Sequence, residues 1–138
     1  MTAPAAAGSY SVTRVVGELV YTAGMTPGRD GVMVTRGALG SGISDELGRE
    51  LAALAAVRAL DAAQASLRLG EQLAEVVSMT VYIAAAPSFT RHSHIADAAS
   101  DVVSERLPGA PLPVRATVGV ASLPGGAPVE IQLIVVKH

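Results

Sequence analysis

The chain has no cysteine and no tryptophan, and it has only one phenylalanine and three tyrosines among 138 residues. Without cysteine it has no disulfide framework, no thiolate nucleophile and no cysteine-based metal site. With so few aromatic rings, its core must be built from alanine, valine and leucine, whose small side chains bury little surface each. Because burial between identical subunits compensates for such a core, the composition predicts a homo-oligomer.

The sequence also lacks a strong charge of either sign. It carries 10 Lys and Arg against 12 Asp and Glu, with no basic run, which disfavours a nucleic-acid partner. No apolar run reaches the ~18 residues of a membrane span, and the N-terminus does not resemble a signal peptide. We therefore expect a cytoplasmic protein with no membrane contact, made of one domain over residues 1–138 with a mobile leader at residues 1–8.

Alternating apolar and polar residues predict a first β-hairpin, formed by residues 10–16 and 19–23 around a turn at Gly17 and Glu18. A short strand is expected at residues 32–34. Tyr10 begins the first strand and Gly24 ends the second. Both positions favour the rim of a pocket, although an edge aromatic and a turn glycine fit the same pattern.

Helical spacing of leucines among many alanines predicts a helix that is capped by Ser44 and stopped by Gly70. Residues 73–84 are apolar and β-branched, as a central strand requires. A second helix is expected from Pro87 to just before Leu107, where prolines follow. This order predicts an α+β fold, a two-layer sandwich with two helices on one face of a mixed sheet.

The last quarter of the chain has the pattern of a second hairpin, because residues 113–120 and 128–135 alternate around a Leu-Pro-Gly-Gly turn. Symmetric pairing puts Arg115 opposite Glu130 on one sheet face, whereas a β-bulge would separate them. A guanidinium matches a carboxylate and a glutamate can orient a water, so the pair suits a small organic acid. A cross-strand ion pair that only sets the register is the alternative.

The three histidines do not form a recognisable metal site. His92 and His94 are two residues apart on a predicted helix, which points them to different sides, and His138 is terminal. No carboxylate completes a ligand set. We therefore expect no metal.

Several segments resemble the RidA/YjgF family of reactive-intermediate deaminases, also known as endoribonuclease L-PSP. The resemblance covers residues 10–136, and its most specific feature is the spacing from Arg115 through Leu-Pro to Glu130. The segments that carry it are Leu-Val-Tyr-Thr-Ala-Gly at residues 19–24, Met-Thr-Val-Tyr-Ile at 79–83 followed by Phe89, Pro-Val-Arg-Ala-Thr-Val-Gly-Val at 113–120, and Val-Glu-Ile at 129–131.

The resemblance implies a chorismate-mutase-like fold, assembled as a homotrimer with clefts between subunits. It implies hydrolysis of 2-imino acids, or their enamine tautomers, to 2-keto acids and ammonia without a cofactor. By position, Arg115 would bind the substrate carboxylate and Glu130 would orient the attacking water. Gly24 and Thr117 would offer backbone groups, Tyr10 would line the cleft, and Phe89 would add an apolar wall from the adjacent subunit.

Two departures from the family pattern concern the site. Ala23 stands where many relatives have a serine, and Thr117 where a cysteine is common. Two alternative functions use the same fold: a non-catalytic trimer that binds a small carboxylate for regulation, and a ribonuclease, which the acidic balance and scarce aromatics disfavour.

Overall fold

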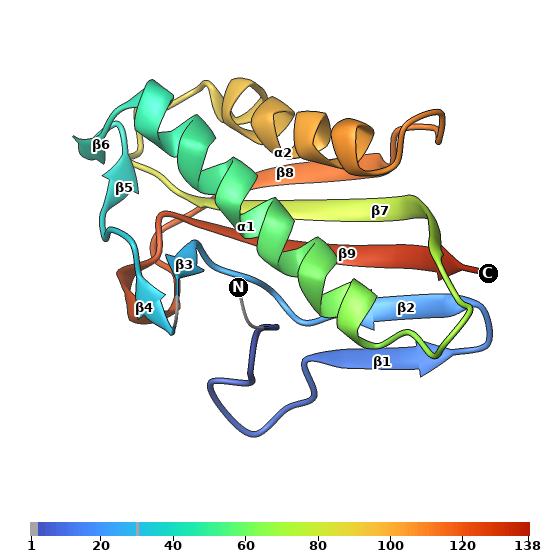
Figure 1. Ribbon diagram of the computed structural model, residues 1–138. Helices are drawn as coiled ribbons and strands as arrows, with labels where there is room; N and C mark the ends of the chain where they lie inside the picture. The colour runs from blue at the N-terminus through green and yellow to red at the C-terminus, as the bar shows by residue number, and fades with distance from the viewer. Residues whose placement is uncertain (1–2, 30) are drawn as a thin grey trace.

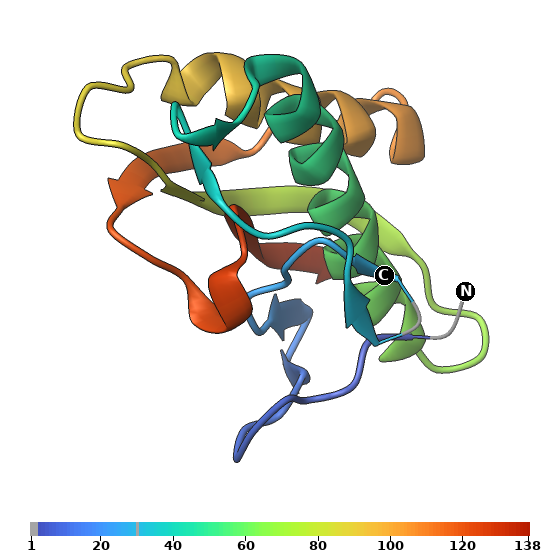
Figure 2. The same cartoon turned by 90° about the vertical axis from the view of Figure 1, so that its left-hand side faces the viewer.

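A computed structural model describes residues 3–29 and 31–138, and within them two helices cover one face of a five-stranded mixed sheet (Figure 1). The sheet order is β1-β2-β9-β7-β8. Both helices lie on the same side of the sheet in two perpendicular views (Figure 2), which confirms the predicted α+β sandwich. The elements are β1 (Thr13–Val16), β2 (Leu19–Thr22), α1 (Asp45–Ala65), β7 (Leu73–Ala84), α2 (His92–Arg106), β8 (Val114–Val120) and β9 (Val129–Lys137).

Short elements occupy the connections. The strand expected at residues 32–34 forms over two residues and pairs with another two-residue strand. A second short pair, before α1, escaped the sequence analysis because two residues are too few to show alternation. These elements are β3 (Gly28–Arg29), β4 (Val32–Met33), β5 (Ala38–Leu39), β6 (Gly42–Ile43) and the 3-10 turn η1 (Pro124–Gly126).

The first hairpin and the start of α1 are confirmed. β1 and β2 pair antiparallel across the predicted turn, although the first strand starts only at Thr13. Ser44 caps α1, since its Oγ accepts a hydrogen bond from the Leu47 amide at 3.1 Å. The helix ends at Ala65, before Gly70, because the Ser66 hydroxyl and amide bond carbonyls of the last turn.

The second helix begins later than expected. Residues 86–89 form a turn, in which the Phe89 amide donates to the Ala86 carbonyl, and α2 starts at His92. Its end at Arg106, just before Leu107, is as predicted. No helix of the described residues is long and apolar enough to cross a bilayer.

The predicted C-terminal hairpin is wrong, because β8 and β9 do not pair with each other. Both strands pair with β7 instead. β8 pairs with one edge of β7 in parallel, and β9 pairs with the other edge antiparallel. β7, α2 and β8 form a β-α-β unit, in which the helix carries the chain back to begin a parallel neighbour. The turn after β8 therefore crosses over β7 instead of closing a hairpin.

The new register separates Arg115 from Glu130. Arg115 lies beside Met79 and Glu130 beside Tyr82, an odd number of residues apart on β7. Since side chains alternate between faces along a strand, the two residues lie on opposite faces of the sheet. Arg115 faces the helices, and Glu130 faces away from them. The shared face predicted from the sequence is wrong.

The core fills the space between the sheet and the helices. Alternate residues of β9 are fully buried there, and α1 covers them with alanines whose small side chains allow close approach of the helix. The fully buried β9 residues are Val129, Ile131, Leu133 and Val135. The residues between them, including Glu130, belong to the sheet face that no helix covers.

Candidate functional site

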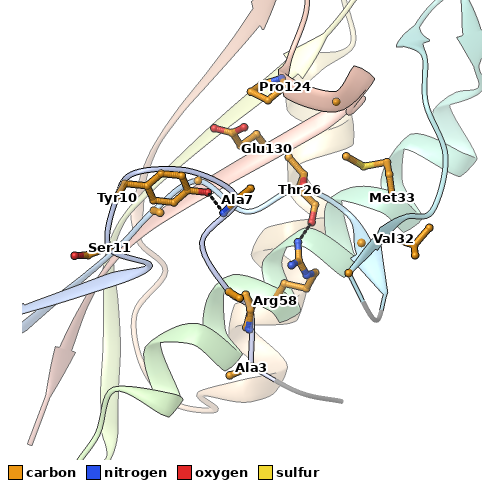
Figure 3. A pocket seen from close by; sticks show the side chains of 17 residues that line it. Ala3, Ala7, Tyr10, Ser11, Thr26, Val32, Met33, Arg58, Pro124 and Glu130 are labelled. Carbon is orange, nitrogen blue, oxygen red and sulfur yellow. Dashed lines mark hydrogen bonds between the residues drawn. The ribbon is translucent and has the colours of Figure 1, made fainter.

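A cavity of about 980 Å³ lies where the N-terminal segment, the end of β2 and the start of β9 meet (Figure 3). Three of the six residues predicted for the site line it: Tyr10, Gly24 and Glu130. Its other lining residues include Ala23, Thr26, Arg58, Met33 and Pro124. Part of this cavity, built from segments far apart in the chain, was therefore predicted from the sequence.

Glu130 contributes a carboxyl to the cavity. Burial raises its pKa above the ordinary value for a glutamate, and no cation counteracts that effect. Within residues 3–29 and 31–138, no hydrogen bond or salt bridge holds the carboxyl, although it lies beside the cavity. A carboxyl that is half-buried, unpartnered and open to a cavity is available to a water or a ligand.

Gly24 leaves room for that carboxyl. The backbone pairs Met25 with Ile131 through bonds of 2.8 and 2.9 Å, which holds the chain after β2 against β9. A Cβ at Gly24 would lie 2.2 Å from Oε2 of Glu130. The Glu130 side chain therefore occupies the space that any larger residue at position 24 would need.

Tyr10 lines the cavity and contacts the N-terminal leader. Its Oη accepts a hydrogen bond from the Ala7 amide at 3.1 Å, and Ala3, Pro4, Ala5 and Ala7 contribute to the lining. The leader was expected at residues 1–8. Residues 1–2 lie outside the described residues, and four of the others contribute to one wall of the cavity. The cavity thus depends on part of the segment that was expected to be a mobile leader.

Arg58 is a charged lining residue that was not predicted from the sequence. It belongs to α1, is half-buried, and donates from Nη1 to the Thr26 carbonyl (Figure 3). Burial lowers its pKa, while Tyr10 acts in the opposite direction. An arginine on a helix is usually read as part of a solvated face. Its position in α1 between Ala56 and Ala59, which are both buried, is the feature that could have indicated a partly buried side chain.

Arg115 and Thr117 lie outside this cavity. Nη1 of Arg115 donates to Oδ1 of Asp97 and to Oγ of Ser100, both at 2.9 Å, so α2 holds the guanidinium. An open groove of about 730 Å³ borders it. The buried Thr117 Oγ1 has no hydrogen-bond partner among the described residues. The structure therefore brings Arg115 and Thr117 together, but on the helix side.

Phe89 is buried within its own chain. Only 6 % of it is exposed, and its ring meets His92 edge-on with centroids 5.1 Å apart. It does not line the cavity. The described residues contain no group of three acidic, histidine or cysteine side chains that could hold a metal ion.

The fold and the cavity define a class of protein: an α+β sandwich with a carboxyl-bearing cavity at the end of its sheet. The comparison with protein families identifies the class, because the model of the family described as Endoribonuclease L-PSP matches residues 1–137. The chain belongs to this family, and the resemblance to RidA/YjgF proteins is confirmed.

Individual proteins and solved structures are similar to this chain as well. The chain is 31 % identical to Protein TCP17 of Trypanosoma cruzi over 121 residues, which are 86 % of this chain and 75 % of that protein. It superposes on Atu1372 of Agrobacterium tumefaciens with a TM-score of 0.89 and 30 % identity, covering 99 % of this chain and 86 % of the other. It also matches YyfA, a Rid-family protein of Yersinia pestis, with a TM-score of 0.63 and 25 % identity over 97 % and 92 % of the chains.

Proposed function

We propose that this protein hydrolyses 2-imino acids, or their enamine tautomers, to 2-keto acids and ammonia. The observation that carries the proposal is the Glu130 carboxyl, which faces a cavity without a partner among the described residues. Membership of a family that includes Rid proteins supports it. Tyr10 and Gly24 shape the space around the carboxyl, and no metal or organic cofactor is needed.

The reaction consumes one water. Glu130 as carboxylate accepts a proton from the water while the oxygen bonds to the imine carbon, whose C=N electron pair moves to nitrogen. The nitrogen takes up protons and leaves as ammonia, while the new C–O bond becomes the keto group. Because an imine carbon is already electrophilic, the main task of the site is to place the water beside it.

Arg115 remains our proposed ligand for the substrate carboxylate, and a second copy of the chain would have to supply it. Within one chain the sheet separates Arg115 from Glu130. β8 is an edge strand, so Arg115 and Thr117 lie at a border of the sheet that a neighbouring protomer can approach. We therefore propose a homotrimer in which each site combines residues of two subunits.

The test compares wild type with Glu130→Gln, using 2-imino acids generated in situ and following keto-acid formation above the buffer rate. General-base catalysis contributes roughly 10²–10⁴-fold, so we expect Glu130→Gln to lower kcat/KM by at least about 100-fold. Glu105→Gln, an exposed change on α2, is the control and should leave the rate unchanged.

The pH profile adds a second signature. Since burial raises the pKa of Glu130, its basic form is lost as pH falls through that raised value, and wild-type kcat/KM should fall with it. Glu130→Gln should lack this limb. Binding of keto acids without any acceleration would instead favour the regulatory carboxylate-binding trimer, and RNA cleavage by nuclease-free protein would favour a ribonuclease.

A further inference from the structure

The cavity contains a cation for which the proposed reaction has no use. Arg58 has five N–H donors, and the described residues show one hydrogen bond, to the Thr26 carbonyl. Among residues 3–29 and 31–138, no carboxylate lies within salt-bridge distance of it. A half-buried guanidinium with no carboxylate partner among these residues is costly, and an anionic ligand would remove that cost.

Arg58 and Glu130 line different parts of the cavity. Figure 3 shows them on either side of Thr26, and no salt bridge joins them. The pKa of Glu130 is raised by burial alone, whereas a nearby cation would lower it. A ligand with its reacting carbon beside Glu130 must therefore extend past Thr26 to reach Arg58.

We propose that Arg58 binds a carboxylate on the side chain of the substrate, so that the preferred substrates are 2-imino dicarboxylic acids. This inference rests on the proposed function and adds the substrate class to it. The planar guanidinium matches a carboxylate through two parallel hydrogen bonds. The cavity of about 980 Å³ is at the upper end of the roughly 300–1,000 Å³ typical of small-molecule sites, so an extended diacid fits its size.

Binding of the keto-acid products tests the inference without requiring turnover. Wild type should bind 2-oxoglutarate about tenfold or more tightly than 2-oxobutanoate, measured by calorimetry, because hydrogen bonds to charged groups are worth about 1.5–3 kcal/mol. Arg58→Gln should lose this preference by weakening 2-oxoglutarate only, and Arg58→Lys should keep part of it. Equal affinities in wild type, or an unchanged preference in Arg58→Gln, would overturn the proposal.

The matched control is Arg29→Gln. Arg29 is an exposed arginine beside Gly28, which lines the cavity, so its removal changes the local charge equally without touching the lining. It should retain the preference for 2-oxoglutarate. Loss of the preference in Arg29→Gln as well would mean that general charge, and not Arg58, selects the diacid.

Turnover separates this inference from the proposed function. Imines made from glutamate and from 2-aminobutanoate are compared, and the first should give the higher kcat/KM. Diacid-selective binding with no acceleration of either imine would contradict the deaminase and support the Arg58 subsite. Acceleration of both without a diacid preference would support the deaminase and overturn the subsite.

Discussion

At the scale of single residues, the central feature of the cavity is Glu130, whose carboxyl has no partner among the described residues. Glu130 is half-buried on a strand whose other face forms the core, so folding itself removes part of its water. Because its folded pKa is raised, ionisation reduces stability as pH rises through the window from the unfolded to the folded pKa. Retaining such a residue is understandable if its carboxylate has a chemical task.

Gly24 offers a direct test of this arrangement. In Gly24→Ala the new methyl group would meet Oε2 of Glu130 at 2.2 Å, so the flexible carboxyl must move. We expect activity to fall by at least about tenfold with little change in Tm, measured by the imine assay and by thermal unfolding.

The double variant Gly24→Ala/Glu130→Gln is the control for this mechanism. If Gly24 acts only by making room for the carboxyl, the double variant should be no less active than Glu130→Gln alone. Additive losses would show that Gly24 contributes independently of Glu130.

At the scale of elements, β7 decides where the predicted site residues lie. Its twelve residues provide two complete edges, and both β8 and β9 pair along them. The alternation of β8 and β9 correctly indicated strands but contains no information about their partners. An intervening helix made the parallel β7–β8 pairing possible, and this pairing placed Arg115 and Glu130 on opposite faces.

The start of α1 was predicted directly from one residue, the capping Ser44. The Ser44 hydroxyl accepts from the Leu47 amide, which would otherwise lack a partner in the first turn. Ser44→Ala should therefore lower the free energy of unfolding by about 1 kcal/mol, measured by denaturant titration. Ser104→Ala, at an exposed helix position, should not destabilise the chain, and an equal loss in both variants would contradict the capping role.

At the scale of the whole molecule, no helix of the described chain covers the sheet face opposite α1 and α2, and several large apolar side chains are exposed on it. Val114 is 72 % exposed and Val118 is 42 % exposed on β8, and Tyr21 on β2 extends the same face. Such a surface is typical of a subunit interface. It agrees with the homo-oligomer expected from a core that has few aromatic residues.

We predict that the protein sediments as a trimer, with three times the 13.9 kDa mass of the chain at micromolar concentration. Val118→Asp should dissociate it, because a charge would be buried on this face. Leu69→Asp, at a fully exposed position outside the sheet, should leave the mass unchanged. A monomeric mass for wild type would contradict both the trimer and the proposed contribution of Arg115 from a neighbour.

The sequence by itself determined the local elements and the family. Period-two and helical spacing, the Ser44 cap and the Arg115–Glu130 spacing are properties of residues close along the chain, and local chemistry is sufficient to interpret them. The same spacing could not show that Arg115 belongs to the helix side, where Asp97 and Ser100 hold it.

Only the tertiary structure decided which residues share a cavity. Arg58 comes from the middle of a helix and Glu130 from the last strand, and both line the cavity, on either side of Thr26. Strand order and face depend on long-range packing of the β7 edges and of α1 and α2 against the sheet. That packing sums many weak contacts over the whole chain, so no local pattern in the sequence specifies it.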